Sequence, residues 1–155
     1  MFSGVEKSMK IAIASDHAGY DLKMLVVEHL KGRGISEVAD LGTDTNKTSV
    51  DYPDYAKKVS QVVLSDKGCL GILICGTGIG MSISANKIKG IRAAHASDPY
   101  SSKMAKRHND ANVLCIGSRV VGPGLAFEII DQWIDAEYED GRHQKRVEKI
   151  EDLEN

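Results

Sequence analysis

LGILICGTGIG, at residues 70–80, joins an apolar run to a glycine-rich turn. Residues 70–75 form a continuous apolar run, which is typical of a central parallel strand buried on both faces. Residues 76–80 place glycine at every second position, just before a helix expected at 81–87. Alternating glycines let backbone N–H groups converge on one point, and such a turn at a helix N-terminus binds an anion or an oxyanion formed during reaction. The stretch therefore predicts a buried strand that leads into an anion-binding loop.

Short β-rich runs alternate with amphipathic segments on both sides of this stretch. The expected strands are 10–14, 36–41, 70–75, 91–95 and 112–116, and the expected helices are 20–31, 53–68, 81–87, 98–106 and 122–136. This alternation predicts a Rossmann-like α/β fold, which is a doubly wound five-stranded parallel sheet with helices on both faces. The strand at 36–41 is the less apolar one and is expected near an edge. Residues 141–155 add a charged C-terminal helical arm, in which only Val147, Ile150 and Leu153 are available for packing.

Size and composition are those of an ordinary globular protein. The 155 residues are expected to form one domain at 9–155 behind a short leader at 1–8. A net charge of −2 provides no basic field to gather nucleic acid. No apolar run approaches the length of a membrane span. We therefore expect a cytoplasmic protein that binds neither nucleic acid nor membranes.

The three cysteines, Cys69, Cys75 and Cys115, form no C-x-x-C pair. This pattern argues against a disulfide framework and a zinc site, and it favours a reducing compartment. Cys69 and Cys115 are interpreted as small core residues. Cys75 differs because it lies where the buried strand meets the glycine loop. A helix N-terminus lowers the thiol pKa from its usual value of about 8.5, so Cys75 is a candidate base or nucleophile.

The other polar groups of interest follow strands of the predicted sheet. In doubly wound sheets, ligands bind beyond the carboxyl ends of the strands. The groups expected there are Asp16, His17, the loop at 75–80, Ser97-Asp98 and Arg119. A nucleotide is an alternative ligand, but the G-x-G-x-G spacing after the third strand fits the dinucleotide fingerprint G-x-G-x-x-G poorly.

Several motifs, in order along the chain, resemble those of the type B ribose-5-phosphate isomerases in the ribose/galactose-6-phosphate isomerase family. They are SDHAG at 15–19, DYPDYA at 51–56, CGTGIGMSISANK at 75–87, GIRA at 90–93, RHNDANV at 107–113, IGSRVVG at 116–122 and GRHQKRV at 141–147. The resemblance extends from about Met9 to the C-terminus. Several separate motifs in one order make it specific.

The resemblance implies an aldose–ketose isomerase that interconverts ribose 5-phosphate and ribulose 5-phosphate through an enediolate, in the non-oxidative branch of the pentose phosphate pathway. It implies a phosphorylated sugar as substrate, with no metal and no cofactor. It also implies a homodimer, or a dimer of dimers, with active sites shared between subunits. Two alternatives stay open: an allose-6-phosphate or galactose-6-phosphate isomerase of the same family, and a non-enzymatic nucleotide-binding module.

By the same resemblance, Cys75 is the base that moves the proton. Thr77 and the backbone amides of the loop would stabilise the enediolate; the loop residues are Gly76, Gly78, Ile79 and Gly80. Some family members lack the cysteine and use a glutamate four residues later. Ile79 occupies that position here and cannot take a proton, so this chain fits the cysteine pattern.

The remaining roles also come from the resemblance. His108 corresponds to the acid/base that opens the sugar ring, and an imidazole with a pKa near 6.5 suits proton transfer in either direction. Asn109 is expected to bind sugar hydroxyls, Asp16 a hydroxyl near the ring oxygen, and His17 to lie near the phosphate. The anion-binding arginines are Arg119, Arg142 and Arg146.

Four other residues are given no functional role. His29, His95 and His143 have no partner at metal-ligand spacing in the sequence and are interpreted as ordinary histidines. Trp133 is interpreted as part of the core or of a dimer interface rather than as a stacking platform.

Overall fold

The computed structural model describes residues 9–155, so the leader expected at 1–8 lies outside the described residues. Strands and helices alternate along the chain as expected. They are β1 (Lys10–Ser15), α1 (Tyr20–Gly32), β2 (Glu37–Asp40), α2 (Tyr52–Ser65), β3 (Cys69–Cys75), α3 (Ile79–Asn86), β4 (Ala93–His95), α4 (Pro99–Asn109), β5 (Val113–Gly117), α5 (Pro123–Asp135), a 3-10 turn η2 (Gly141–His143) and α6 (Gln144–Asp152).

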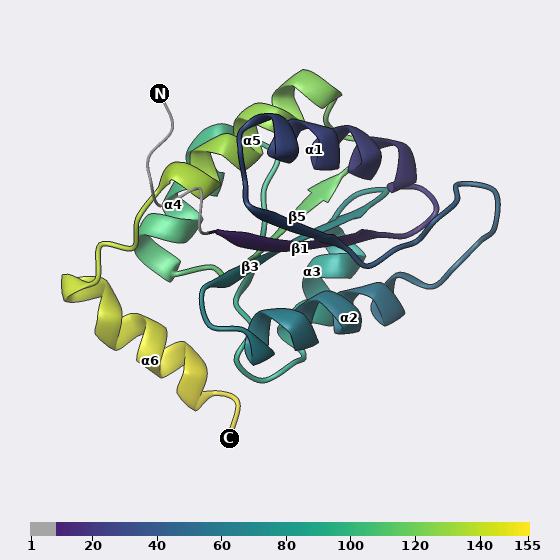
Figure 1. The fold of residues 1–155 in the computed structure, drawn as a ribbon. Coiled ribbons are helices and arrows are strands. Elements are labelled where there is room, and N and C mark those ends of the chain that lie inside the picture. Colours follow the sequence, from purple (N-terminus) through teal and green to yellow (C-terminus); the bar gives the residue numbers. More distant parts are fainter. Residues whose placement is uncertain (1–8) are drawn as a thin grey trace.

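The described strands form one parallel sheet in the order β2-β1-β3-β5-β4. The apolar strand β3 is central, and the less apolar β2 lies at one edge. Figure 1 shows helices on both faces of this sheet, with α1 and α5 on one side and α2 and α3 on the other. The predicted Rossmann-like, doubly wound fold is therefore confirmed.

Alternate residues of each strand enter two apolar layers, because successive side chains point to opposite faces of a sheet. Ile72 and Ile74 of β3 pack in the layer beneath α1 and α5, whereas Leu73 and Cys75 pack in the layer beneath α2 and α3. Trp133 of α5 is fully buried in the first layer, which confirms its interpretation as a core residue. Both faces of β3 are thus covered, as its continuous apolar run indicates.

Two helices differ from their expected bounds in ways that affect the site. α3 begins at Ile79 instead of Met81, because Gly78 adopts the left-handed conformation (φ +82°) and caps the helix. α4 continues to Asn109 instead of Lys106. The residue that caps its end, Asp110, is also left-handed (φ 48°). The loop residues 79 and 80 therefore lie in a helical first turn, and His108 lies in a helical last turn.

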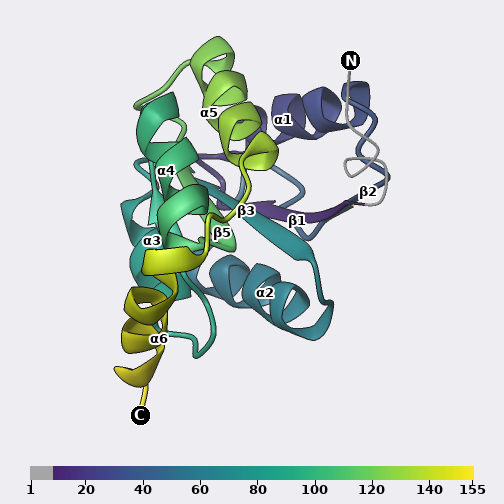
Figure 2. The ribbon, with the colours of Figure 1, turned by 90° about the vertical axis from the view of Figure 1, so that its left-hand side faces the viewer.

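The C-terminal arm is held mainly by polar contacts. Val147 is buried, but Ile150 is 43% exposed and Leu153 84% exposed, so the expected apolar stripe packs only at its start. Arg92 Nη1 lies 2.9 Å from Glu151 Oε1, and the Gly90 N–H donates to Glu154 Oε1 at 2.9 Å. Figure 2 shows α6 at the end of the molecule, extending away from α4 and α5. None of the helices in residues 9–155 has the length and hydropathy that crossing a membrane requires.

Candidate active site

A cavity of about 410 Å³ lies beyond the carboxyl ends of the central strands, where the fold predicts a ligand site. It brings together several predicted site residues: Asp16, Cys75, Gly76, Thr77, Ile79, Gly80 and Arg119. Tyr52 and Ile83 also line it, although the sequence indicates no role for either. In the sequence, Tyr52 is marked only by its position in the motif at 51–56, and Ile83 only by its helical spacing from Ile79.

Cys75 ends β3 at the floor of this cavity. Its side chain is 4% exposed, and the N–H of Gly78 donates to its Sγ at 3.1 Å. A hydrogen bond to sulfur stabilises the thiolate over the thiol. The first turn of α3 also directs free backbone N–H groups toward this end of the helix. Sγ of Cys75 therefore lies beside backbone N–H donors at the wall of the cavity.

The other loop groups are fixed by local hydrogen bonds. Thr77 Oγ1 accepts the N–H of Ile79 at 3.2 Å, which leaves the Thr77 hydroxyl proton available for an oxygen in the cavity. His95 Nε2 lies 2.8 Å from the carbonyl oxygen of Thr77 and donates to it. His95 therefore makes a structural contact with the loop. The sequence could not indicate the contact, because β4 and the loop are brought together only by the sheet.

The loop lies directly on the end of β5. A Cβ at Gly117 would be 2.5 Å from the carbonyl carbon and oxygen of Thr77, which is far inside van der Waals contact. Gly117 is thus the residue that lets the loop approach the sheet this closely.

Gly117→Ala is expected to displace the loop, because the added methyl group meets backbone rather than a flexible side chain. We expect a loss of about 1–3 kcal/mol in the free energy of unfolding and a lower turnover. Urea unfolding and an isomerase assay measure the two effects. Gly124→Ala is the matched control, since open space surrounds Gly124 in the first turn of α5. Equal effects of the two substitutions would contradict the proposed close approach.

Asp16 and Arg119 form two further parts of the cavity wall. Asp16 is buried, and its Oδ1 accepts the N–H of Gly19 at 3.1 Å. The guanidinium of Arg119 lies over Gly76, since a Cβ there would be 3.1 Å from Arg119 Nη1. His17 lies in the same turn as Asp16, but its Nδ1 accepts the N–H of Val50 at 3.2 Å, and it does not line the cavity.

The remaining predicted site residues lie beyond the amino ends of the strands, opposite to the Cys75 cavity. α4 starts after the carboxyl end of β4 and returns to the amino end of β5, so its last turn is far from the Cys75 loop of the same chain. His108, Asn109, Arg142 and Arg146 belong to that last turn and to the arm that follows it. These four residues are not among the groups that the sheet argument places at the carboxyl ends of the strands, and the resemblance implies that such sites are shared between subunits.

His108 is surrounded by groups that the sequence does not connect with it. Its ring stacks on that of His143, with 4.2 Å between centroids and 12° between planes. Glu139 Oε1 lies 3.6 Å from His108 Nε2 and 3.5 Å from His143 Nε2. His143 is buried within this cluster. The pairing arises because the chain turns back after α5 and places residue 139 against residue 107.

Charge in this cluster is unevenly distributed. Desolvation, followed by the charges of His108 and Arg142, lowers the pKa of His143. Desolvation opposes ionisation of Glu139, but the hydrogen bond and charge of Arg107 outweigh it and lower the pKa of Glu139. Ligand atoms of His108, Glu139 and His143 lie within 4.8 Å of one another. However, the in-plane lone pairs of two nearly parallel imidazoles do not meet at one ion, so the present arrangement suits proton transfer better than metal binding.

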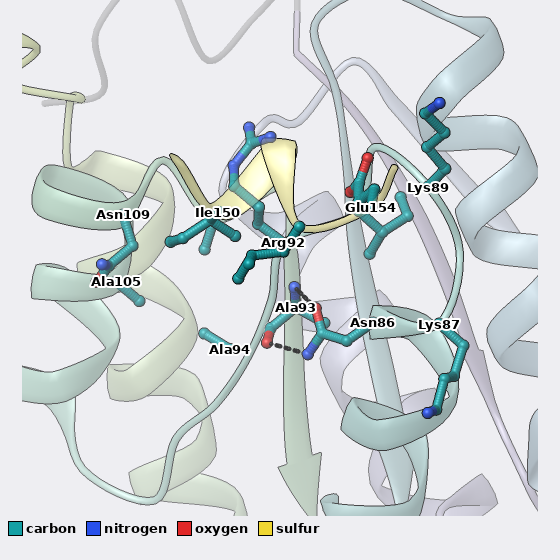
Figure 3. A pocket seen from close by; sticks show the side chains of 13 residues that line it. Asn86, Lys87, Lys89, Arg92, Ala93, Ala94, Ala105, Asn109, Ile150 and Glu154 are labelled. Carbon is teal, nitrogen blue, oxygen red and sulfur yellow. Dashed lines mark hydrogen bonds between the residues drawn. The ribbon is translucent and has the colours of Figure 1, made fainter. Parts of the chain in front are cut away.

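Asn109 faces a second and larger hollow, of about 650 Å³, between α4, β4 and α6. Figure 3 shows Asn109 and Ala105 on one side of it, Ile150 of the arm above, and Asn86 holding the backbone of Ala93 on the other side. Asn86 donates to the Ala93 carbonyl at 2.9 Å and accepts the Ala93 N–H at 2.8 Å. Asn109 is therefore separated from the Cys75 cavity of its own chain.

Comparison with known proteins matches this arrangement to one family. The family model described as Ribose/Galactose Isomerase matches residues 11–150. The ribose-5-phosphate isomerase B of Escherichia coli is 52% identical over 145 residues, which cover 94% of this chain and 96% of that protein. The ribose-5-P isomerase B of Listeria innocua is 46% identical over 145 residues, which cover 94% of this chain and 97% of that protein.

Solved structures agree with the sequence relatives. The ribose-5-phosphate isomerase B of Clostridium thermocellum superposes with a TM-score of 0.91 at 53% identity, covering 94% of this chain and 97% of that one. That of Mycoplasma genitalium, solved with bound ribulose-5-phosphate, gives a TM-score of 0.89 at 43% identity and covers 95% of this chain and 97% of that one. With the cysteine loop in place at the end of β3, this chain belongs to the ribose/galactose isomerase family.

Proposed function

We propose that this chain interconverts ribose 5-phosphate and ribulose 5-phosphate. Membership of the family and about 50% identity to named ribose-5-phosphate isomerases support this activity. The observation that carries the proposal is the contact of the Gly78 N–H with Cys75 Sγ, at the floor of a cavity lined by Thr77. A stabilised thiolate beside a donor-rich loop is what an enediolate reaction requires.

In the open-chain aldose, the Cys75 thiolate takes the proton from C2, and the electron pair of that C–H bond forms the C1–C2 double bond. The carbonyl oxygen at C1 becomes the oxyanion. The hydroxyl of Thr77 and the N–H groups of the first turn of α3 stabilise this oxygen. Return of the proton to C1, with transfer of the O2 proton to O1, gives the ketose. Both steps move only protons and need no redox partner.

We further propose that two chains share each active site. Four candidate residues lie beyond the amino ends of the strands, on the side of the sheet away from Cys75: His108, Asn109, Arg142 and Arg146. A second copy must therefore supply them if they act on the same sugar. His108 would then open the furanose ring, with Glu139 placed to accept or return its proton. Arg142 and Arg146 are one helical turn apart and would bind the phosphate dianion together.

The groups around Cys75 would orient the sugar. Asp16 is fixed by Gly19 and would accept a hydroxyl near the ring oxygen, while Arg119 would bring positive charge to the rim beside Gly76. His17 does not line the cavity, so its expected place near the phosphate depends on the second copy.

A substrate panel tests the proposed function. Ribose 5-phosphate, allose 6-phosphate and galactose 6-phosphate are compared as substrates of the purified full-length protein. We expect kcat/KM to be highest for ribose 5-phosphate by about tenfold or more, since an extra carbon must move either C2 or the phosphate from its binding group. A preference for either hexose phosphate would contradict the pentose assignment. Adenine nucleotides are the negative arm and are expected to leave Tm unchanged.

A further inference from the structure

We infer that His95 is a positioning residue that stabilises the thiolate of Cys75 through a single peptide group. His95 Nε2 donates to the carbonyl oxygen of Thr77 at 2.8 Å. The N–H of the same peptide unit, which belongs to Gly78, donates to Cys75 Sγ at 3.1 Å. His95 ends β4 and Cys75 ends β3, with β5 between them in the sheet. The peptide at 77–78 therefore connects the two side chains through one hydrogen bond on each side.

The two hydrogen bonds reinforce each other. In a trans peptide, the C=O and N–H bonds point in opposite directions, so a donor at the oxygen and an acceptor at the hydrogen lie on opposite sides of one rigid plane. Donation to the oxygen increases the polarity of the N–H, and chains of hydrogen bonds strengthen in this way by about 10–30% per bond. A stronger N–H donor favours the thiolate over the thiol and lowers the thiol pKa.

The packing fixes this geometry. A Cβ at Gly78 would be 2.9 Å from His95 Cδ2, so the imidazole lies directly against Gly78. Gly78 adopts the left-handed conformation, and its N–H points to the sulfur. His95 thus sets the rotation of this peptide plane as well as its polarity. Because the Thr77 carbonyl oxygen can only accept, the Nε2 of His95 carries the hydrogen of this bond.

Other groups near the sulfur also influence its ionisation, and they stay constant when only His95 is changed. Asp16 of the turn after β1, Arg119 after β5 and Tyr52 at the start of α2 line the same cavity. The Cys115 thiol of β5 belongs to the same apolar layer. The catalytic consequence rests on the proposed function, in which the Cys75 thiolate is the base. The ionisation of Cys75 itself can be measured without any substrate.

The test compares His95→Leu, His95→Asn and His95→Gln with the wild type. The Gln Nε2 can reach the Thr77 carbonyl as the imidazole Nε2 does, whereas the shorter Asn amide cannot and Leu has no donor. Alkylation of the Cys75-containing peptide by iodoacetamide is followed by mass spectrometry from about pH 6 to about pH 10, because only the thiolate reacts. The midpoint of the profile reports the pKa, and the plateau at high pH reports access to the sulfur.

We expect the midpoint to rise by about half a unit to one unit in the Leu and Asn variants, which is about a three- to tenfold smaller thiolate fraction below the midpoint. The Gln variant is expected to keep the wild-type midpoint, and all plateaus are expected to agree. In the isomerase assay, kcat should fall by the same factor at neutral pH in the Leu and Asn variants, with KM unchanged.

Superimposed profiles for wild type, Leu and Asn would overturn the inference, as would a raised midpoint in the Gln variant. If Leu fails to fold, the contrast between Asn and Gln decides the outcome. Loss of isomerase activity in every protein, wild type included, would instead contradict the proposed function. The alkylation profiles would still decide the role of His95 in that case.

Discussion

Replacing Cys75 with alanine is expected to lower kcat for ribose 5-phosphate by about a hundredfold to ten-thousandfold, the range that a general base contributes. Binding of the sugar phosphate should survive, because Arg119 and the backbone amides of the loop remain. Cys75→Ser should be almost as inactive, since a hydroxyl keeps the shape of the side chain but ionises far less readily than a thiol. Steady-state kinetics and isothermal titration with ribose 5-phosphate separate the two effects.

Cys69→Ala is the matched control for this prediction. Cys69 begins the strand that Cys75 ends, and it is buried in the same apolar layer. We expect turnover to stay near the wild-type value, with a loss of about 1 kcal/mol in the free energy of unfolding. Near-normal turnover in Cys75→Ala would reject Cys75 as the base, and equal losses in both variants would point to damage of the strand.

The second large effect is a recovery of activity when two inactive variants are co-expressed. Co-expressed Cys75→Ala and His108→Ala chains are expected to reach about a quarter of wild-type turnover, because half of the dimers are mixed and each mixed dimer has one site with both groups intact. Each variant alone should show only residual activity. The whole co-expressed population, assayed at equal subunit concentration, gives this measurement, and mixed dimers isolated with two different tags should reach about half of wild-type turnover.

The control mixture pairs Cys75→Ala with Asp16→Ala. Both residues line the same cavity of one chain, so neither site of a mixed dimer would contain both groups, and no recovery is expected. Recovery in this control, or none in the first mixture, would show that the two halves of the site are not exchanged between subunits.

The fold could be predicted from the sequence because its signals are local. The apolar run of β3, the alternation of short strands with amphipathic helices and the glycines around them each depend on neighbouring residues. The differences lie at helix ends, where one backbone conformation decides the boundary. Gly78 caps α3 two residues early, and Asp110 lets α4 continue three residues longer than expected.

The candidate site could be predicted where its residues share a loop or closely follow strands of the sheet, as Asp16 and Arg119 do. Cys75, Thr77 and Gly78 are neighbours in sequence, and their hydrogen bonds follow from the turn. The contacts of His95 with Thr77 and of His143 with His108 join separate elements, so no local pattern indicates them. The resemblance named His108 as part of the site, but the separation of His108 from Cys75 depends on the direction of α4.

The polar attachment of the C-terminal arm has a consequence for how the molecule loses structure. Because α6 is held by Arg92, Gly90 and a few exposed carboxylates, its docking depends on ionic strength, whereas the sheet depends on apolar burial. The arm can therefore undock while the strands stay intact, as a separate unit of low local stability. Arg146 of α6, one of the two arginines that we propose bind the phosphate, would then be released from the site before any of the chemistry at Cys75 is disturbed.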